Sequence, residues 1–167
     1  MKYDLVLDSM LGKTARWLRV LGYSVYYDPS ASDSELVRIA KDEGCALVTR
    51  DRGLRDRALR EGIRAVYVEL TSNEEILKYL SRELGIRLTI DLSKTRCPKC
   101  NGKLRRVGRR EVKGLVEEKV LERYDEFFVC EDCRAVYWPG RQFRSMKAIL
   151  ERLARSPLPG TPHRSAH

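Results

Sequence analysis

Histidine is scarce in this chain of 167 residues, because the two that occur, His163 and His167, both lie in the C-terminal tail. A histidine-based catalytic triad or a histidine-ligated catalytic zinc therefore has nothing to use. Long hydrophobic runs are also missing, since none approaches the roughly 20 residues of a membrane-spanning helix. The first four residues, MKYD, place an acid where a signal peptide begins its apolar stretch, so we expect a cytoplasmic protein. Any catalysis must run on carboxylates.

Positive charge is distributed unevenly along the chain. Residues 1–92 contain 15 Lys and Arg and 15 Asp and Glu, whereas residues 93–167 contain 18 and 9 and so carry the whole net charge of +9. The composition, 34% charged and 43% hydrophobic, is otherwise that of a globular protein and excludes a collagen-like or wholly disordered chain. The basic part predicts contact with a polyanion, most economically nucleic acid; a membrane surface, proximity to a ribosome and plain solubility are the alternatives.

Four of the five cysteines form two C-x-x-C pairs, Cys97 with Cys100 and Cys130 with Cys133. With 29 residues between the pairs, this is the spacing of a zinc ribbon, in which four thiolates hold one structural Zn²⁺. Asn101 and Gly102 follow the first pair and readily take the positive φ of a tight turn around a metal. Disulfides or redox-active dithiols are the alternatives, which an intracellular setting and the repeated motif disfavour. Cys45 opens an apolar run and is expected in the core.

The hydrophobic pattern before the first cysteine pair alternates between two periods. Short apolar runs at 3–7, 24–27, 46–49 and 65–70 are typical of strands. The segments 10–21, 32–44, 55–61 and 72–85 repeat apolar residues at helical spacing, and the second and fourth begin with a Ser-x-x-Glu capping box. Four βα units in succession predict an α/β fold of three layers with a mainly parallel sheet over residues 1–92.

The chain changes character after this part. Residues 86–92 alternate apolar and polar side chains and form either an edge strand or an extended connection. Beyond them we expect short strands at 103–107, 126–129 and 135–138. We also expect a helix-prone insertion at 111–122 and an amphipathic closing helix at 144–154. Residues 93–156 thus form a zinc ribbon with its closing helix, and residues 157–167 form a disordered tail.

Acidic residues follow the predicted strands at their carboxyl ends, where a parallel sheet places its ligand site. Asp8 ends the first strand, Asp51 follows the third, and Asp33 and Glu35 begin the helix after the second. Converging carboxylates repel one another unless a hard cation binds between them, and oxygen ligands select Mg²⁺ or Mn²⁺. Such an ion supports hydrolysis of a phosphodiester bond. Because of the repulsion, replacing Asp8 or Asp51 by Asn is expected to preserve the fold or even stabilise it.

Two of these acids have a purely structural alternative. Glu35 comes three residues after Ser32, so it could serve only as part of a capping box. Asp33, in the first turn of the same helix, could serve only to favour the helix dipole.

Basic side chains near the acids are candidates to hold substrate phosphates: Lys13, Arg16, Arg50 and Arg52. A second set, which follows the first cysteine pair, would contact RNA or form a solvated hairpin: Arg105, Arg106, Arg109 and Arg110. We expect Arg19 to lie on a solvated face of its helix rather than to contact phosphate. For Trp17 we expect packing in the core or at its edge rather than stacking on a base.

Nucleotide binding of the P-loop type is a weaker alternative. Gly12, Lys13 and Thr14 imitate the end of a P-loop, but Leu7 stands where the motif needs Gly. No G-x-G-x-x-G follows any predicted strand either.

Several stretches of the chain resemble the Mut-seven C-terminal RNase domain family, PIN-like nucleases with an appended zinc ribbon. In the first part these are residues 8–19, 21–23 and 49–52. In the second part they are residues 97–102, 122–127 and 130–140. The resemblance covers roughly residues 3–150 and implies a PIN-like α/β/α domain over residues 1–92 whose acids bind a divalent ion and cut RNA.

The resemblance also implies roles for single residues. Asp8 and Asp51 match the family's acids, and Lys13 and Arg16 match its basic positions. Ser34 separates Asp33 from Glu35, where the family has an adjacent acidic pair. The ribbon motif, which provides either a substrate surface or a packing surface, is matched by Tyr124, Asp125, Tyr137 and Trp138.

Together these observations predict a ribonuclease that depends on Mg²⁺ or Mn²⁺ and carries a structural zinc ribbon that aids RNA binding. RNA is the expected partner, a ribosome or other RNA-processing proteins are further candidates, and no membrane partner is expected. The alternative is a non-catalytic RNA-binding or ribosome-associated adaptor that keeps the acids for shape.

Overall fold

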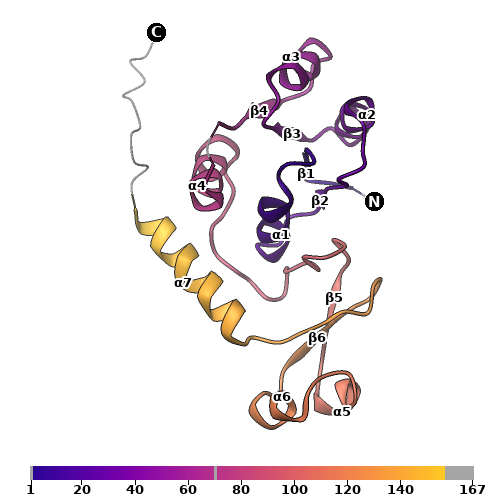
Figure 1. The fold of residues 1–167 in the computed structure, drawn as a ribbon, viewed down its shortest axis with the longest axis vertical. Coiled ribbons are helices and arrows are strands. Elements are labelled where there is room, and N and C mark those ends of the chain that lie inside the picture. Colours follow the sequence, from indigo (N-terminus) through magenta and orange to yellow (C-terminus); the bar gives the residue numbers. More distant parts are fainter. Residues whose placement is uncertain (1, 70, 157–167) are drawn as a thin grey trace.

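The computed structural model describes residues 2–69 and 71–156. Four βα units come first along the chain: β1 (Leu5–Leu7), α1 (Gly12–Val20), β2 (Val25–Tyr26), α2 (Asp33–Glu43), β3 (Ala46–Thr49), α3 (Arg52–Arg60), β4 (Ala65–Tyr67) and α4 (Asn73–Leu84). The four strands are parallel and lie in the order β2-β1-β3-β4 (Figure 1). The predicted α/β class with a mainly parallel sheet is confirmed.

Two clusters of buried side chains separate the three layers. Leu5 and Leu7 of β1 belong to a cluster with α1 and α4, whereas Val6 between them belongs to a cluster with α2 and α3. This division follows from the alternation of side chains along a strand. Because helices cover both faces of the sheet, β1 is apolar at every position, as parallel sheets require.

The second part of the chain is built around a small antiparallel sheet. It comprises β5 (Leu104–Val107), α5 (Arg109–Val112), α6 (Glu118–Arg123), β6 (Phe127–Cys130), β7 (Val136–Tyr137) and α7 (Arg141–Arg155). The strands lie in the order β5-β6-β7. The helix-prone insertion between the cysteine pairs is split into two short helices, α5 and α6, and Gly114 lies between them with a φ of 85°.

The C-terminal half of helix α7 packs against α4 in the first part of the chain (Figure 1). Its Leu150 and Leu153 lie in the same buried cluster as α4. Lys78 of α4 donates to the Leu153 carbonyl (2.5 Å), and Arg152 of α7 pairs with Glu74 (2.8 Å). The closing helix therefore returns the chain to α4, and the assignment of residues 93–156 to one ribbon unit stays a prediction.

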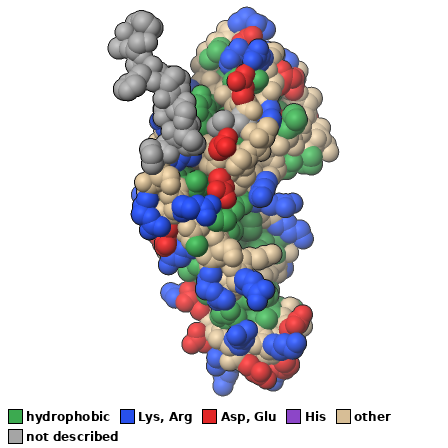
Figure 2. Space-filling model, turned by 60° about the vertical axis from the view of Figure 1, so that its left-hand side comes forward, with side chains coloured by type: hydrophobic (Ala, Val, Ile, Leu, Met, Phe, Trp, Pro, Cys, Tyr) green, Lys and Arg blue, Asp and Glu red, His purple; other side chains and the backbone are tan. Residues whose placement is uncertain are grey.

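The side of the molecule that carries α4 and α7 combines two kinds of side chain. Figure 2 shows hydrophobic side chains in the middle of this face, with Lys and Arg side chains on either side of them. No helix of the described residues is long and apolar enough to cross a membrane.

Some element boundaries differ from the predictions. Residues 86–91 pair with no strand of the described chain and form an extended connection, with Ile86 and Leu88 buried against the first core. Helix α3 begins at Arg52, three residues earlier than predicted, because Asp51 caps it. The predicted tail, residues 157–167, lies outside the described residues.

Candidate active site and metal centre

The ends of β1 and β3 flank the point at which the strand order changes direction. Strand β1 lies between β2 on one side and β3 on the other, so the loops that leave β1 and β3 diverge. Such a switch point is where open α/β sheets bind their ligands. Asp8 directly follows β1, and Asp51 follows β3 after one intervening residue. The two strongest acidic candidates are thus placed at the same edge of neighbouring strands.

The Asp8 carboxylate is 5% exposed and accepts three hydrogen bonds. Its Oδ1 accepts from the Met10 N–H (3.0 Å), and its Oδ2 accepts from the Thr49 hydroxyl (2.5 Å) and from the Arg50 N–H (2.7 Å). A carboxylate offers about four lone-pair positions, so about one acceptor position remains. These bonds join the ends of β1 and β3 and fix the orientation of the acid.

Asp51 is exposed and acts as the N-cap of α3, with its Oδ1 accepting from the Leu54 N–H (3.0 Å). Its own N–H donates to the Thr49 hydroxyl (2.9 Å), the same group that donates to Asp8. Thr49 therefore links the Asp8 carboxylate to the Asp51 backbone, a role that was not predicted from the sequence. Its signal was a hydroxyl at the end of a buried strand, which must find a partner.

Asp33 and Glu35 lie exposed in the first turn of α2. Glu35 completes the predicted capping box, because its carboxylate accepts from the Ser32 N–H (3.0 Å) while the Ser32 hydroxyl accepts from the Glu35 N–H (3.2 Å). Within residues 2–69 and 71–156, no three carboxylates have ligand atoms that all lie within 4.8 Å of one another. The structure therefore does not gather all four predicted acids into one tight cluster.

The four predicted phosphate-binding cations near the acids differ in their surroundings. Lys13 and Arg16 are exposed and share one face of α1. Arg50 is half-buried and lines a cleft together with Lys13. Arg52 is turned elsewhere, since it pairs with Glu69 (2.6 Å) and lies over the Tyr67 ring.

A cleft with a volume of about 380 Å³ adjoins the loop that follows Asp8 and lies between α1, Arg50, the start of α4 and Ile149 of α7. Met10, which donates to Asp8, lines it. Asn73, another lining residue, accepts from the Thr14 hydroxyl (2.9 Å), and its amide nitrogen is buried without a partner among the described residues. A larger hollow of about 720 Å³ lies at the amino ends of the strands and adjoins none of the predicted acids.

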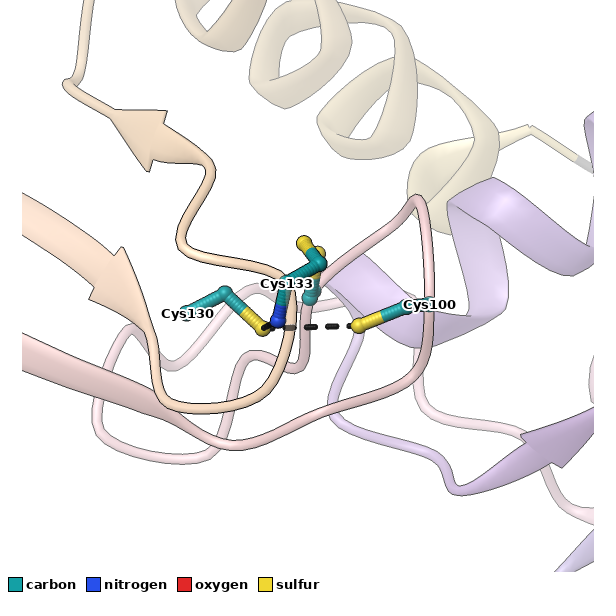
Figure 3. Close-up of side chains that lie close together, drawn as sticks. Cys100, Cys130 and Cys133 are labelled. Atoms are coloured by element: carbon teal, nitrogen blue, oxygen red, sulfur yellow. Dashed lines mark hydrogen bonds between the residues drawn. The ribbon is translucent and has the colours of Figure 1, made fainter.

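The four cysteines of the C-x-x-C pairs form one cluster, and Figure 3 shows three of them, Cys100, Cys130 and Cys133. Their sulfur atoms all lie within 4.8 Å of one another, with 3.7 Å between Cys97 and Cys133 and 3.4 Å between Cys100 and Cys130. Four sulfurs in a tetrahedron about 2.3 Å from a zinc ion would lie about 3.8 Å apart, so the cluster suits one metal ion. No disulfide joins the cysteines, and Cys45 is half-buried against the second core cluster.

The turns of the cluster depend on unusual backbone geometry. Asn101 and Arg134, which follow the two pairs, have φ values of 73° and 66°. The positive φ predicted for Asn101 is therefore confirmed, whereas the positive φ predicted for Gly102 was wrong. Gly102 is required for a different reason, because a Cβ there would lie 2.8 Å from the Cys130 sulfur.

Hydrogen-bond donors surround the sulfur atoms. Burial acts to raise the pKa of the Cys130 thiol, but the N–H groups of Cys133 and Asp132, together with the Cys100 and Cys133 thiols, outweigh it and lower this pKa to about 7. Burial raises the pKa of Cys100 to about 12. The Tyr137 hydroxyl lies 3.1 Å from the Cys97 sulfur, and burial followed by this contact raises the pKa of Tyr137. Tyr137 thus keeps its proton and can donate it to a metal-bound thiolate.

The first cysteine turn packs on the edge strand of the main sheet. The Val25 N–H of β2 donates to the Asn101 side-chain oxygen (2.9 Å), and the Asn101 amide donates to the Ser24 hydroxyl (3.0 Å). The Arg19 guanidinium donates to the Val25 carbonyl (2.8 Å) and to the Pro98 carbonyl (3.1 Å). The prediction of a solvated Arg19 was wrong, because these two carbonyls hold its charge in a site that is 5% exposed.

The four arginines that follow the first cysteine pair do not share one surface. Arg105 and Arg106 are neighbours in β5, so their side chains point to opposite faces. Arg105 pairs with Glu111 (2.9 Å), Arg106 pairs with Glu126 (2.8 Å), and Arg109 donates to the Tyr124 carbonyl (2.9 Å). Arg110 is exposed.

Comparison with known proteins covers both sites. The family model of the Mut7-C RNAse domain matches residues 3–150, a span that includes the acids, the cysteine cluster and most of α7. Neither the curated proteins nor the solved structures contain a match. The chain belongs to the Mut7-C RNAse domain family.

Proposed function

We propose that this protein is a ribonuclease that hydrolyses RNA phosphodiester bonds with the help of a divalent metal ion. Membership in an RNAse domain family supports the nuclease role. The observation that carries the proposal is that Asp8 and Asp51 follow neighbouring strands at one switch point, where the Thr49 hydroxyl links the Asp8 carboxylate to the Asp51 N–H. The oriented carboxylate of Asp8 and the exposed carboxylate of Asp51 form the reactive edge of the site.

Asp8 and Asp51 are the proposed ligands for Mg²⁺ or Mn²⁺. The donor set fits such an ion, because Mg²⁺ sites commonly use one or two carboxylates and leave the other positions to water and phosphate. When bound, the ion would neutralise charge on the scissile phosphate and activate water for hydrolysis. Asp33 is a better candidate for a third acid than Glu35, whose carboxylate is used by the capping box.

Cations of the same site would hold the substrate. Lys13, Arg16 and Arg50 are proposed to bind phosphates on either side of the scissile bond. Arg52 would first have to leave Glu69, and the β5 arginines Arg105 and Arg106 would have to leave their own acidic partners. The four clustered cysteines are proposed to hold one structural zinc, which keeps the ribbon folded as an aid to RNA binding.

A specific observation also favours the adaptor function. Each acid also has a structural role: Asp8 accepts three hydrogen bonds and Asp51 caps a helix. The fold alone would therefore retain both residues. The distinguishing experiment follows end-labelled single-stranded RNA with the purified protein as Mg²⁺ or Mn²⁺ is titrated. Cleavage that requires the added ion supports the nuclease, whereas RNA that is bound and never cut with either ion supports the adaptor.

A further inference from the structure

We infer that a groove between α1 and α7 binds single-stranded RNA and leads it from the acids to the ribbon. This inference rests on the proposed function and names the path of its substrate. The groove consists of two hollows. One is the cleft of about 380 Å³ that adjoins the loop after Asp8, and the other is an apolar hollow of about 160 Å³ where α7 meets the ribbon.

The two hollows follow each other along the same pair of helices. Trp17 of α1 and Ile149 of α7 line the first, while Val20 of α1 and Met146 of α7 line the second. From the first hollow to the second, the lining residue moves by three positions on each helix, which is roughly one turn or about 5 Å. The direction is toward the C-terminus of α1 and toward the N-terminus of α7. The second hollow ends at Trp138 of the ribbon. A strand that lay in this groove would therefore reach from the Asp8 end of the sheet to the ribbon.

The floor of the groove is apolar and partly accessible. Its side chains are half-buried, which leaves part of each surface facing the groove: Trp17, Trp138, Phe143, Met146 and Ile149. Unpaired bases stack on aromatic side chains regardless of sequence. The centroid of the Trp138 ring lies 6.3 Å from that of Phe127, and the ring also lines the hollow. Trp138 therefore packs in the ribbon and offers part of its surface for base stacking. Tyr137 is instead directed to the Cys97 sulfur.

The helices that border the groove are strongly basic. Helix α1 has no acid and two exposed cations, since its third cation, Arg19, is buried; α7 has five cations and one acid, Glu151. Lys13 and Arg16 on α1 and Lys147 on α7 are exposed. Hydrophobic side chains flanked by Lys and Arg are visible on the α7 side in Figure 2. Alternating cations and aromatic surfaces suit a polyanion whose bases are unpaired, which is a single strand rather than a duplex.

The test is binding of a labelled oligouridine across a salt series, without added Mg²⁺ or Mn²⁺ so that the RNA stays intact. Lys13→Ala/Lys147→Ala should weaken binding and make the negative slope of log K against log salt shallower by about 1.4, or about 0.7 for each lost phosphate contact. Trp138→Leu should weaken binding roughly tenfold and leave the slope unchanged. The matched control, Arg38→Ala/Lys41→Ala, removes two exposed cations from α2 and should bind as the parent does.

Several outcomes would overturn the inference. One is that the Lys13→Ala/Lys147→Ala variant binds oligouridine with the same affinity and the same salt slope as the control variant. Another is that the protein binds duplex RNA or anionic phospholipid vesicles more tightly than oligouridine. Loss of binding confined to a variant with Ala at Arg105, Arg106, Arg109 and Arg110 would place the RNA on the ribbon hairpin instead. A protein that binds oligouridine through the groove but cuts no RNA with either ion contradicts the nuclease and supports the groove.

Discussion

Asp8 and Asp51 contribute differently to the fold, and this difference decides how each can be tested. The Asp8 carboxylate uses both of its oxygens as acceptors, for donors at the end of β3, just after β3, and in its own loop. Asp51 contributes one helix cap at an exposed position. An amide in place of Asp8 would turn one acceptor into a donor, whereas an amide in place of Asp51 still caps a helix.

Asp8→Asn should therefore destabilise the protein, in contrast to the expectation from charge repulsion alone. The Asn NH₂ group would face at least one N–H donor that now bonds to a carboxylate oxygen, so the free energy of unfolding should fall by about 1–3 kcal/mol. Urea unfolding of parent and variant measures the change. Asp42→Asn, at an exposed site whose nearest cation is 3.7 Å away, should stay within about 0.5 kcal/mol. Parent-like stability of Asp8→Asn would show that its hydrogen bonds do not hold the strand ends together.

Residues with a local signature were predictable, and residues whose partners are remote in sequence were not. The cysteine spacing and the Ser32 capping box depend on neighbours three or four positions away. Arg19 is buried because of carbonyls at Val25 and Pro98, and the second of these is 79 residues away. Composition alone assigns an arginine to the surface, so only the tertiary structure reveals this site.

At the scale of elements, the first cysteine turn completes the main sheet. Strand β2 is an edge strand, and edge strands leave backbone groups unpaired. Asn101 and Arg19 take the place of a neighbouring strand at Val25, one at its N–H and the other at its carbonyl. The ribbon is thereby joined to the α/β part by hydrogen bonds as well as by chain connection.

Asn101→Gly should weaken this junction without straining the turn, because glycine tolerates the φ of 73°. The Val25 N–H would lose its buried acceptor, so unfolding free energy should fall by about 1–3 kcal/mol. Arg134→Gly is the matched control, with a φ of 66° at the corresponding position of the second cysteine turn, where the side chain is exposed. Chemical denaturation of both variants provides the comparison. Equal stabilities would mean that the Asn101 side chain does not hold the edge strand.

Periodicity predicted the main elements well but not where each helix begins or packs. Strands β1 and β3 and helix α2 were recognisable because their apolar patterns match one secondary structure throughout. The start of α3 was missed because Asp51 was assigned to a loop, although an acid before an amphipathic run is also an N-cap signal. The pattern of α7 predicted an apolar face and could not identify α4 as the element that covers it.

For the molecule as a whole, the cysteine cluster supports more than the ribbon. The cysteine turns hold Asn101 and Pro98, which contact β2 and α1, and α1 carries Lys13 and Arg16. The neutral and basic parts of the sequence are also not separate in the folded protein. Helix α7, with its five cations, belongs to the basic half of the chain but packs against the neutral half.

Loss of the metal should therefore loosen the edge of the main sheet. The parent should contain about one zinc per chain by elemental analysis, and Cys100→Ser should lose it because a closed site needs four thiolates. Hydrogen exchange of the Val25 amide should then accelerate far more than that of Val48 in the central strand β3. Cys45→Ser is the control and should retain the zinc. Unchanged protection of Val25 in metal-free protein would show that the ribbon and the sheet are independent.

The central claim, metal-dependent RNA cleavage at the β1–β3 switch point, is tested most directly by the cleavage rate of Asp51→Asn. Because Asn caps helices about as well as Asp, the free energy of unfolding should stay within about 0.5 kcal/mol of the parent. Removing the charge removes a proposed metal ligand, so cleavage in Mg²⁺ or Mn²⁺ should fall by about 100-fold or more. A folded Asp51→Asn protein that cuts RNA at the parent's rate would contradict the account.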